Sequence, residues 1–190
     1  MTRRRLHSKV ETVIGLDLSL RAAAACAIPL KWNQDMTRIR TMVIGHGVTQ
    51  GDEEGRLDRL DAISSKIGDF CVDNRAKVVA LEEYAFSQGQ AHAHSIGEVG
   101  GVVKLEIRRR LEITPQPIFS PTARKTLLQW LPSVRGKPKG YLKKYVAANV
   151  RRLEGITSKW TEDEIDAFVI ANHALMLAGG MAMTFEGEEF

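Results

Sequence analysis

Residues 13–19 read VIGLDLS, an apolar run of β-strand type that contains a single carboxylate, Asp17. Aliphatic and β-branched side chains in a short run predict a buried strand. A carboxylate in such a strand is costly unless it has a partner, a metal ion or a place at the solvent-facing strand end. We therefore interpret Asp17 as a candidate functional residue; the alternative is a strand-end residue that caps the turn at Ser19.

Carboxylates stand at two further points of the chain. Residues 78–84, VVALEEY, form a second apolar run, and its Glu82 and Glu83 must point to opposite faces of a strand. The later stretch TEDEIDA places Asp163 and Asp166 one helical turn apart on one face. Acids in a first helical turn also stabilise the helix dipole without any function, and this alternative fits Asp163 better than the deeper Asp166.

Carboxylates that folding gathers repel one another unless a cation neutralises them. Hard oxygen ligands of this kind suit Mg²⁺ or Mn²⁺. Two such ions about 4 Å apart form the clamp that nucleases use on a phosphodiester. If the fold unites these acids, the sequence predicts a metal-dependent nuclease site.

The three motifs, in this order, resemble the RuvC family of Holliday-junction resolvases, within the RNase H-like nuclease superfamily. The motifs are GLDLS on the first strand, LEEY on a later strand and DxxDA at the start of the last helix. The resemblance covers residues 12–178. Cellular RuvC proteins usually have Pro-Gly after the first Asp, whereas this chain has Leu18-Ser19 and looks more like the divergent RuvC-like proteins of phages.

The resemblance implies an Mg²⁺-dependent endodeoxyribonuclease that resolves Holliday junctions and other branched DNA by paired nicking, leaving 5′-phosphate and 3′-hydroxyl ends. The catalytic and metal-binding residues would be Asp17, Glu82, Asp163 and Asp166, holding two Mg²⁺ ions for which Mn²⁺ substitutes. It also implies a homodimer, in the cytoplasm of a prokaryotic or phage-infected cell. Two other functions stay open: an RNase H-fold nuclease that matures ribosomal RNA, and a branched-DNA-binding module without catalysis.

The segment from Lys104 to Arg152 carries thirteen Lys or Arg and two acids, although the whole chain has a net charge of only +4. Such a segment favours a polyanionic substrate; the alternative is a solvated charged surface. A Gly/Pro-broken loop within it runs into a helix N-terminus, where backbone amides and lysines suit phosphates. We expect DNA contacts from Arg124, Lys125, Lys137, Lys139, Lys143 and Lys144. By resemblance we add Phe86, whose alternative is an ordinary core position.

Three glycines, Gly97, Gly100 and Gly101, interrupt a predicted helix over 95–111, where each costs about 1 kcal/mol relative to Ala. Small residues let another helix approach closely. The resemblance places a dimer interface on this helix; the alternative is close packing within the monomer.

The histidines have less specific interpretations. We expect His173 to be a hydrogen-bonded histidine packed against the core, on roughly the same helix face as Asp166. His92 and His94 are expected in a polar loop near DNA, and their spacing is not a zinc pattern because no Cys is nearby.

The composition, 44% apolar and 26% charged over 190 residues, predicts one globular domain over 1–190, with a peripheral basic arm at 1–11 and a peripheral tail at 180–190. No apolar run approaches the roughly 20 residues of a membrane span, and the basic start lacks the apolar stretch of a signal peptide. Cys26 and Cys71 lie in apolar segments, which predicts buried free thiols in a reducing compartment.

Periodicity predicts strands over 12–18, 22–30, 39–48, 77–84 and 113–119, and helices over 55–73, 95–111, 121–130, 141–153 and from 161 to about 179. Thr161 and Glu164 form a capping box that opens the last helix. Pro115 and Pro117 suit a strand at the sheet edge. This order is an α/β arrangement. The resemblance specifies an RNase H-like fold, with a central mixed sheet of about five strands flanked by helices.

Overall fold

The computed structural model describes residues 10–19, 22–45, 53–83, 90–128, 137–138, 140–153 and 160–185. Its elements, in chain order, are β1 (Thr12–Asp17), β2 (Ala22–Pro29), the 3₁₀ turn η1 (Met36–Arg38), β3 (Arg40–Gly45), α1 (Glu53–Asp73), β4 (Ala76–Glu82), α2 (Gln90–Leu111), β5 (Gln116–Ile118), α3 (Ser120–Leu128), α4 (Tyr141–Val150) and α5 (Glu162–Leu177).

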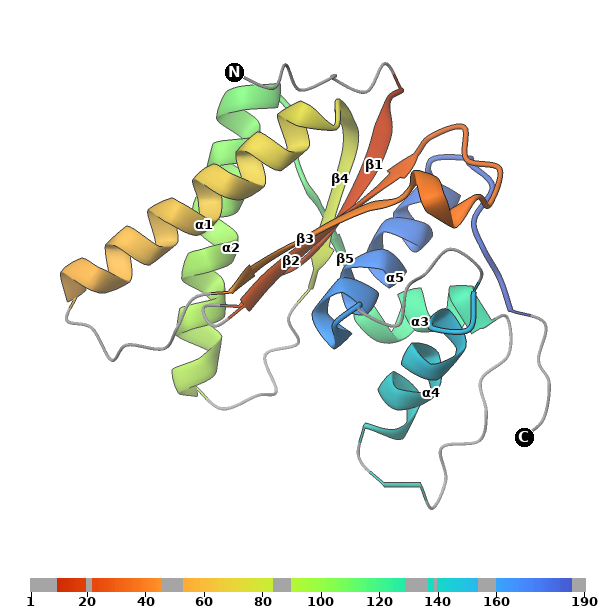
Figure 1. The fold of residues 1–190 in the computed structure, drawn as a ribbon. Helices are drawn as coiled ribbons and strands as arrows, with labels where there is room; N and C mark the ends of the chain where they lie inside the picture. Colours follow the sequence, from red (N-terminus) through yellow and green to blue (C-terminus); the bar gives the residue numbers. More distant parts are fainter. Residues whose placement is uncertain are drawn as a thin grey trace, which may run out of the picture.

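Within the described residues, five strands form one mixed sheet in the order β3-β2-β1-β4-β5 (Figure 1). β1 to β3 are a meander of antiparallel strands, whereas β4 pairs parallel to β1, and β5 pairs parallel to β4. The short β5 contains Pro117 and lies at the edge, where a missing backbone N–H is tolerated. The predicted mixed sheet with flanking helices is confirmed.

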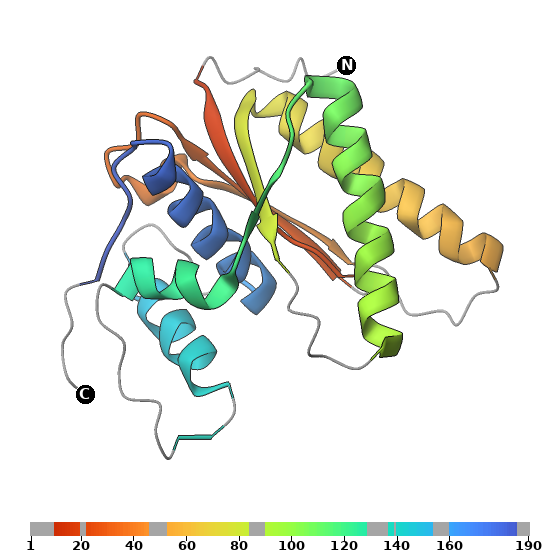
Figure 2. The same cartoon turned by 180° about the vertical axis from the view of Figure 1, so that it is seen from behind.

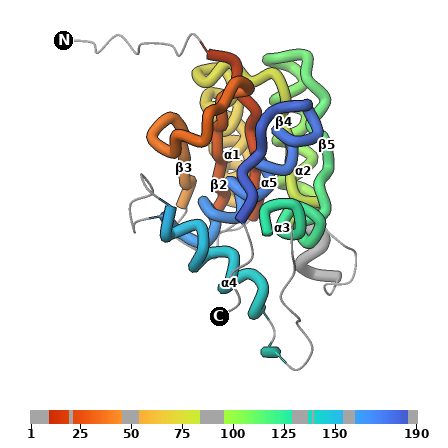
Figure 3. Tube along the Cα trace, turned by 90° about the vertical axis from the view of Figure 1, so that its right-hand side faces the viewer, coloured from red at the N-terminus to blue at the C-terminus, as the bar shows by residue number. Residues whose placement is uncertain are grey.

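Helices cover both faces of the sheet. α1 and α2 lie on one face, and α5 lies on the other with α3 and α4 beyond it (Figures 1 and 2). Seen from the side, α4 lies at the end of the molecule opposite the start of β1 (Figure 3). The sheet therefore separates two hydrophobic cores, one on each side.

The two-residue period of the strands decides which side chains enter which core. Val13 of β1 packs in the α5 core, whereas Ile14 and Leu16 pack against α1 and α2. In β4, Ala80 faces α5, whereas Val79 and Leu81 face the other side. By the same alternation, Asp17, which follows Leu16, and Glu82, which follows Leu81, lie on the α5 face of the sheet.

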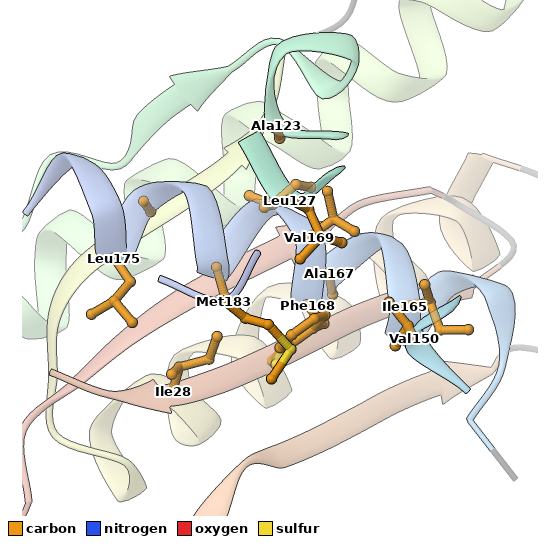
Figure 4. Close-up of a cluster of buried hydrophobic side chains, with 14 of the residues drawn as sticks. Ile28, Ala123, Leu127, Val150, Ile165, Ala167, Phe168, Val169, Leu175 and Met183 are labelled. Carbon is orange, nitrogen blue, oxygen red and sulfur yellow. The ribbon is translucent and has the colours of Figure 1, made fainter. Parts of the chain in front are cut away.

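α5 is the central helix of its core. Every residue from Ile165 to Leu175 is buried, because the helix is enclosed by the sheet, α3, α4 and the segment that follows it. Figure 4 shows Val169 of α5 beside Leu127 of α3, and Phe168 beside Met183. Trp32 and Trp160 contact the Phe168 ring edge-on, with centroids 6.3 and 5.9 Å away.

Met183, in the segment expected to be peripheral, packs on α5 instead. The Asn172 side chain donates to the backbone oxygen of Met183 at 2.8 Å and accepts from its N–H at 2.7 Å. Met183 is buried in the α5 core (Figure 4), and the Phe185 N–H donates to Leu127. The local sequence around Met183 does not predict this packing, because its hydrogen-bond partner, the Asn172 side chain, lies eleven residues earlier in the chain. The rest of the tail, 186–190, lies outside the described residues, as does most of the arm at 1–11.

α2 begins at Gln90, earlier than periodicity predicts, so the expectation that His92 and His94 lie in a loop is wrong. The first turn of this helix carries no apolar stripe, and so it has no periodic signal. Both cysteines are buried free thiols, as predicted. In the described ranges, no helix is long and apolar enough to cross a membrane.

Candidate metal centre

Asp17 and Glu82 lie at the carboxyl ends of two neighbouring parallel strands. The β1–β4 ladder pairs Leu16 with Leu81, so each acid is the next residue along its strand. The alternation of the strands turns both toward α5, and the charge of Glu82 contributes to a raised pKa of Asp17. Glu83 is exposed, as expected for a residue on the opposite face. The period of the strand therefore distinguishes Glu82 from Glu83.

The environment of Asp17 shows that further acids are close. Burial raises its pKa to about 8, and the charges of Asp166, Glu82 and Asp163 add to the rise, while Lys143 opposes it. The structure thus brings together all four acids predicted from the sequence. In the metal-free protein, a proton on Asp17 relieves part of their mutual repulsion.

Glu82 has a mixed environment. Burial raises its pKa, Arg124 opposes the rise, and Asp166 adds to it. Hydrogen bonds from Ser120 and Asp17 favour the ionised form. Ser120 is the first residue of α3 and is buried, and Arg124 follows one turn later, so α3 presents both side chains to the acids.

The start of α5 positions Asp163 and Asp166. Thr161 and Glu164 form the predicted capping box, in which the Thr161 hydroxyl accepts from the Glu164 N–H, and Glu164 accepts from the Thr161 N–H. The other oxygen of Glu164 accepts from the Thr41 hydroxyl of β3 at 2.6 Å. These contacts tie the first turn of α5 to the sheet. Burial raises the pKa of the partly exposed Asp163, and Lys143 opposes that rise.

Asp166 lies deepest of the four acids, with 7% of its side chain exposed, and it is held by two cations. Arg124 Nη2 from α3 lies 2.9 Å from Oδ1, and Lys143 Nζ from α4 lies 2.6 Å from Oδ2. Lys143 also lies 3.7 Å from Glu162. Two residues predicted to contact DNA are therefore part of the acid cluster.

The other predicted contact residues have varied positions. Lys125 and Lys144 are exposed, and Lys137 lies over the Tyr141 ring, 5.1 Å from its centroid. Lys139 and Phe86 lie outside the described residues. His173 is buried and its Nδ1 is 2.8 Å from the Thr126 hydroxyl, which confirms the expected hydrogen-bonded core histidine.

Sequence reasoning missed three contributors to this site. Ser120 had one usable signal, its position at the start of a helix four residues before Arg124. Thr41 and the ion pairs of Asp166 had none, since they join elements far apart in the chain.

The donor set fits a hard divalent cation. All four acids supply oxygen only, and their repulsion is the condition that such an ion relieves. Arg124 and Lys143 already supply positive charge at this point. Among the described residues, no three acidic, histidine or cysteine side chains enclose an ion position as they stand, so the carboxylates would have to draw closer around one.

Comparison of the whole fold with solved structures finds similarity to RuvC proteins. The Thermus thermophilus RuvC in complex with a Holliday junction substrate is 19% identical, with a TM-score of 0.65 over 92% of this chain and 99% of that one. A second T. thermophilus RuvC structure is also 19% identical, with a TM-score of 0.62 over 89% and 97%. The chain has the RuvC fold.

The yeast mitochondrial Holliday junction resolvase Ydc2 shares this RuvC fold more distantly, at 14% identity and a TM-score of 0.50 over 91% of this chain and 82% of that one. By sequence, no protein-family model and no curated protein matches the chain. The resemblance seen in three short motifs therefore extends to the architecture of nearly the whole RuvC domain. At these low sequence identities, the comparison establishes the fold alone.

Proposed function

We propose that this chain is a divalent-metal-dependent, structure-selective DNA endonuclease that resolves four-way junctions and other branched DNA. The observation that carries the proposal is the convergence of Asp17, Glu82, Asp163 and Asp166, from two strand ends and one helix start, on a RuvC fold. Acids clustered only to stabilise a helix dipole would not include the ends of β1 and β4.

The four acids would hold Mg²⁺, or Mn²⁺ in its place. Bound there, two such ions would supply an activated water for in-line attack and stabilise the leaving 3′-oxygen. The chain's own groups orient these acids: Ser120 holds Glu82, and the capping box with Thr41 holds the start of α5. Arg124 and Lys143 bring positive charge to the place where a phosphate would enter. We expect 5′-phosphate and 3′-hydroxyl ends.

Branched DNA is the proposed substrate for two reasons. A protein of this fold, the T. thermophilus RuvC, is known in complex with a Holliday junction. This chain also has exposed Lys125, Lys137 and Lys144, and such side chains contact phosphates without reading sequence. We therefore expect selection by the shape of the DNA rather than by its bases.

We also propose a homodimer, because resolving a junction needs nicks in two strands related by two-fold symmetry. The glycines of α2 support this. A Cβ added at the exposed Gly97 or Gly101 meets no described atom within 4 Å, so the alternative of close packing within the monomer has no support at these two positions, whereas Gly100 is buried. The exposed Leu105 follows Gly101 by one turn on the same helix.

The deciding experiment offers the protein a synthetic four-way junction, a fork, a linear duplex and an RNA hairpin, each with Mg²⁺ and with EDTA. Symmetric cleavage of the junction, only with Mg²⁺, supports the proposal. Cleavage of the RNA in preference to all DNA would indicate an RNA-processing nuclease. Tight junction binding without cleavage in Mg²⁺ or Mn²⁺ would indicate a binding module.

A further inference from the structure

Both carboxylate oxygens of Asp166 are occupied by cations from two different helices. Arg124 of α3 lies 2.9 Å from Oδ1, and Lys143 of α4 lies 2.6 Å from Oδ2. These are charge-assisted hydrogen bonds of short length, which are about twice as strong as neutral ones. An ion approaching the deepest acid of the cluster must therefore compete with both side chains.

The same two cations also serve the neighbouring acids. Arg124 lowers the pKa of Glu82 in addition to forming the ion pair with Asp166. Lys143 opposes the rise in the pKa of Asp17 and of Asp163, and its Nζ lies 3.7 Å from Glu162. The protein's own side chains thus supply positive charge to each of these acids.

Both side chains have an alternative partner in a phosphate. Arg recognises phosphate through its planar fork, and Lys does so as a point charge on a flexible stem. Lys143 is 36% exposed in the first turn of α4, so a change of rotamer can turn it outward. Arg124 is 15% exposed, so it is less free to move.

Resting on the function proposed above, we propose that Arg124 and Lys143 exchange partners when DNA binds. In the free protein they occupy Asp166; on DNA they turn to phosphates and release its oxygens for the ions. The binding of DNA and the binding of divalent ions then favour each other, and the coupling is reciprocal. The site takes up its ions readily only where a phosphate backbone is present.

The test measures the affinity for Mn²⁺ from the free-ion signal in electron paramagnetic resonance, with and without a four-way junction. The signal is read before the junction is appreciably cleaved, so the readout does not depend on turnover. The test variants are Arg124→Gln and Lys143→Gln. Their matched controls are Lys125→Gln and Lys144→Gln, which remove the same charge from the next, exposed residue.

Without DNA, we expect the test variants to bind Mn²⁺ on the order of fivefold more tightly than their controls, which is the size of a single ion pair. Wild type should gain affinity when the junction is added, and Lys143→Gln should gain less. Mn²⁺ binding in the test variants that is equal to or weaker than in the controls overturns the exchange, because the cations then organise the site.

The wild-type measurement needs no variant to fold, and an unchanged Mn²⁺ affinity on adding the junction also overturns the exchange. A different result distinguishes the failure of the proposed function. If wild type binds no Mn²⁺, or binds it no better than Asp17→Asn does, the proposed metal-dependent function is wrong. The proposed exchange of partners is then wrong as well.

Discussion

A Cβ placed on Gly15 of β1 would lie 2.2 Å from the carbonyl oxygen of Ala167 and 2.3 Å from the N–H nitrogen of Ala171, both in α5. The backbones of the central strand and the central helix thus touch, and only glycine fits between them. This contact lies two residues before Asp17 in β1 and one residue after Asp166 in α5. It therefore sets the distance between the strand acids and the helix acids.

We predict that Gly15→Ala destabilises the protein by about 3 kcal/mol or more, because backbone atoms cannot yield as a flexible side chain does. Urea unfolding measures this change. The matched control is Gly45→Ala in β3, where an added Cβ meets no described atom within 4 Å. Equal unfolding midpoints for the two variants would show that α5 can move away from β1 at little cost.

Asp17→Asn or Glu82→Gln should abolish junction cleavage, while junction binding is kept or strengthened. Each change removes a proposed ion ligand and a negative charge near the DNA phosphates. Cleavage with Mg²⁺ and binding by gel shift are measured side by side. Glu83→Gln is the control, since this neighbouring acid is exposed directly after the end of β4. Near-normal cleavage by Asp17→Asn would show that Asp17 is not a ligand of the catalytic ions.

Asp166→Asn should reduce the single-turnover cleavage rate more than Asp163→Asn does. Asp166 is buried and meets two cations, whereas Asp163 is partly exposed near the helix start, where a dipole role suffices. A larger loss for Asp163→Asn would reverse the ranking of the two helix acids.

The stability of the metal-free protein should fall as the pH rises. The folded-state pKa of Asp17, about 8, lies above the ordinary 3.8, so the folded protein keeps a proton that the unfolded chain releases. This contribution is complete below the ordinary value and is lost as the pH passes through about 8. Melting curves in EDTA should show the loss, and Asp17→Asn should make it smaller. Curves for the two proteins that stay parallel from acid to alkaline pH speak against the buried proton.

Gly101→Leu should convert a dimer into a monomer that still binds Mn²⁺ but nicks only one strand of a junction. The added side chain would hold apart two helices that approach at the glycines of α2. Light scattering gives the mass, and the ratio of nicked to resolved product gives the outcome on DNA. A wild type that is monomeric even on junction DNA would exclude the paired-nick arrangement, and a dimeric variant would move the interface elsewhere.

Much of the fold and the four acids follow from local sequence, because their signals are local. The apolar runs around Asp17 and Glu82 predict buried strands, and the period of two puts Glu82 and Glu83 on opposite faces. The choice of Glu82 over Glu83 came from the family resemblance. The pair Thr161 and Glu164 predicts where α5 begins, and therefore where Asp163 and Asp166 share a face. These properties need only neighbouring residues.

The positions of Arg124 and Lys143 depended on the tertiary structure. In the sequence they belong to a basic segment and predict surface contacts, but α3 and α4 pack beside α5 and carry them to Asp166. Gly15 likewise has no local signal, because its need for glycine comes from a helix about 150 residues later. Backbone conformation is set by neighbours in the chain. Contact between distant charges and distant backbones is set by how helices pack on the sheet, which residue types alone do not specify.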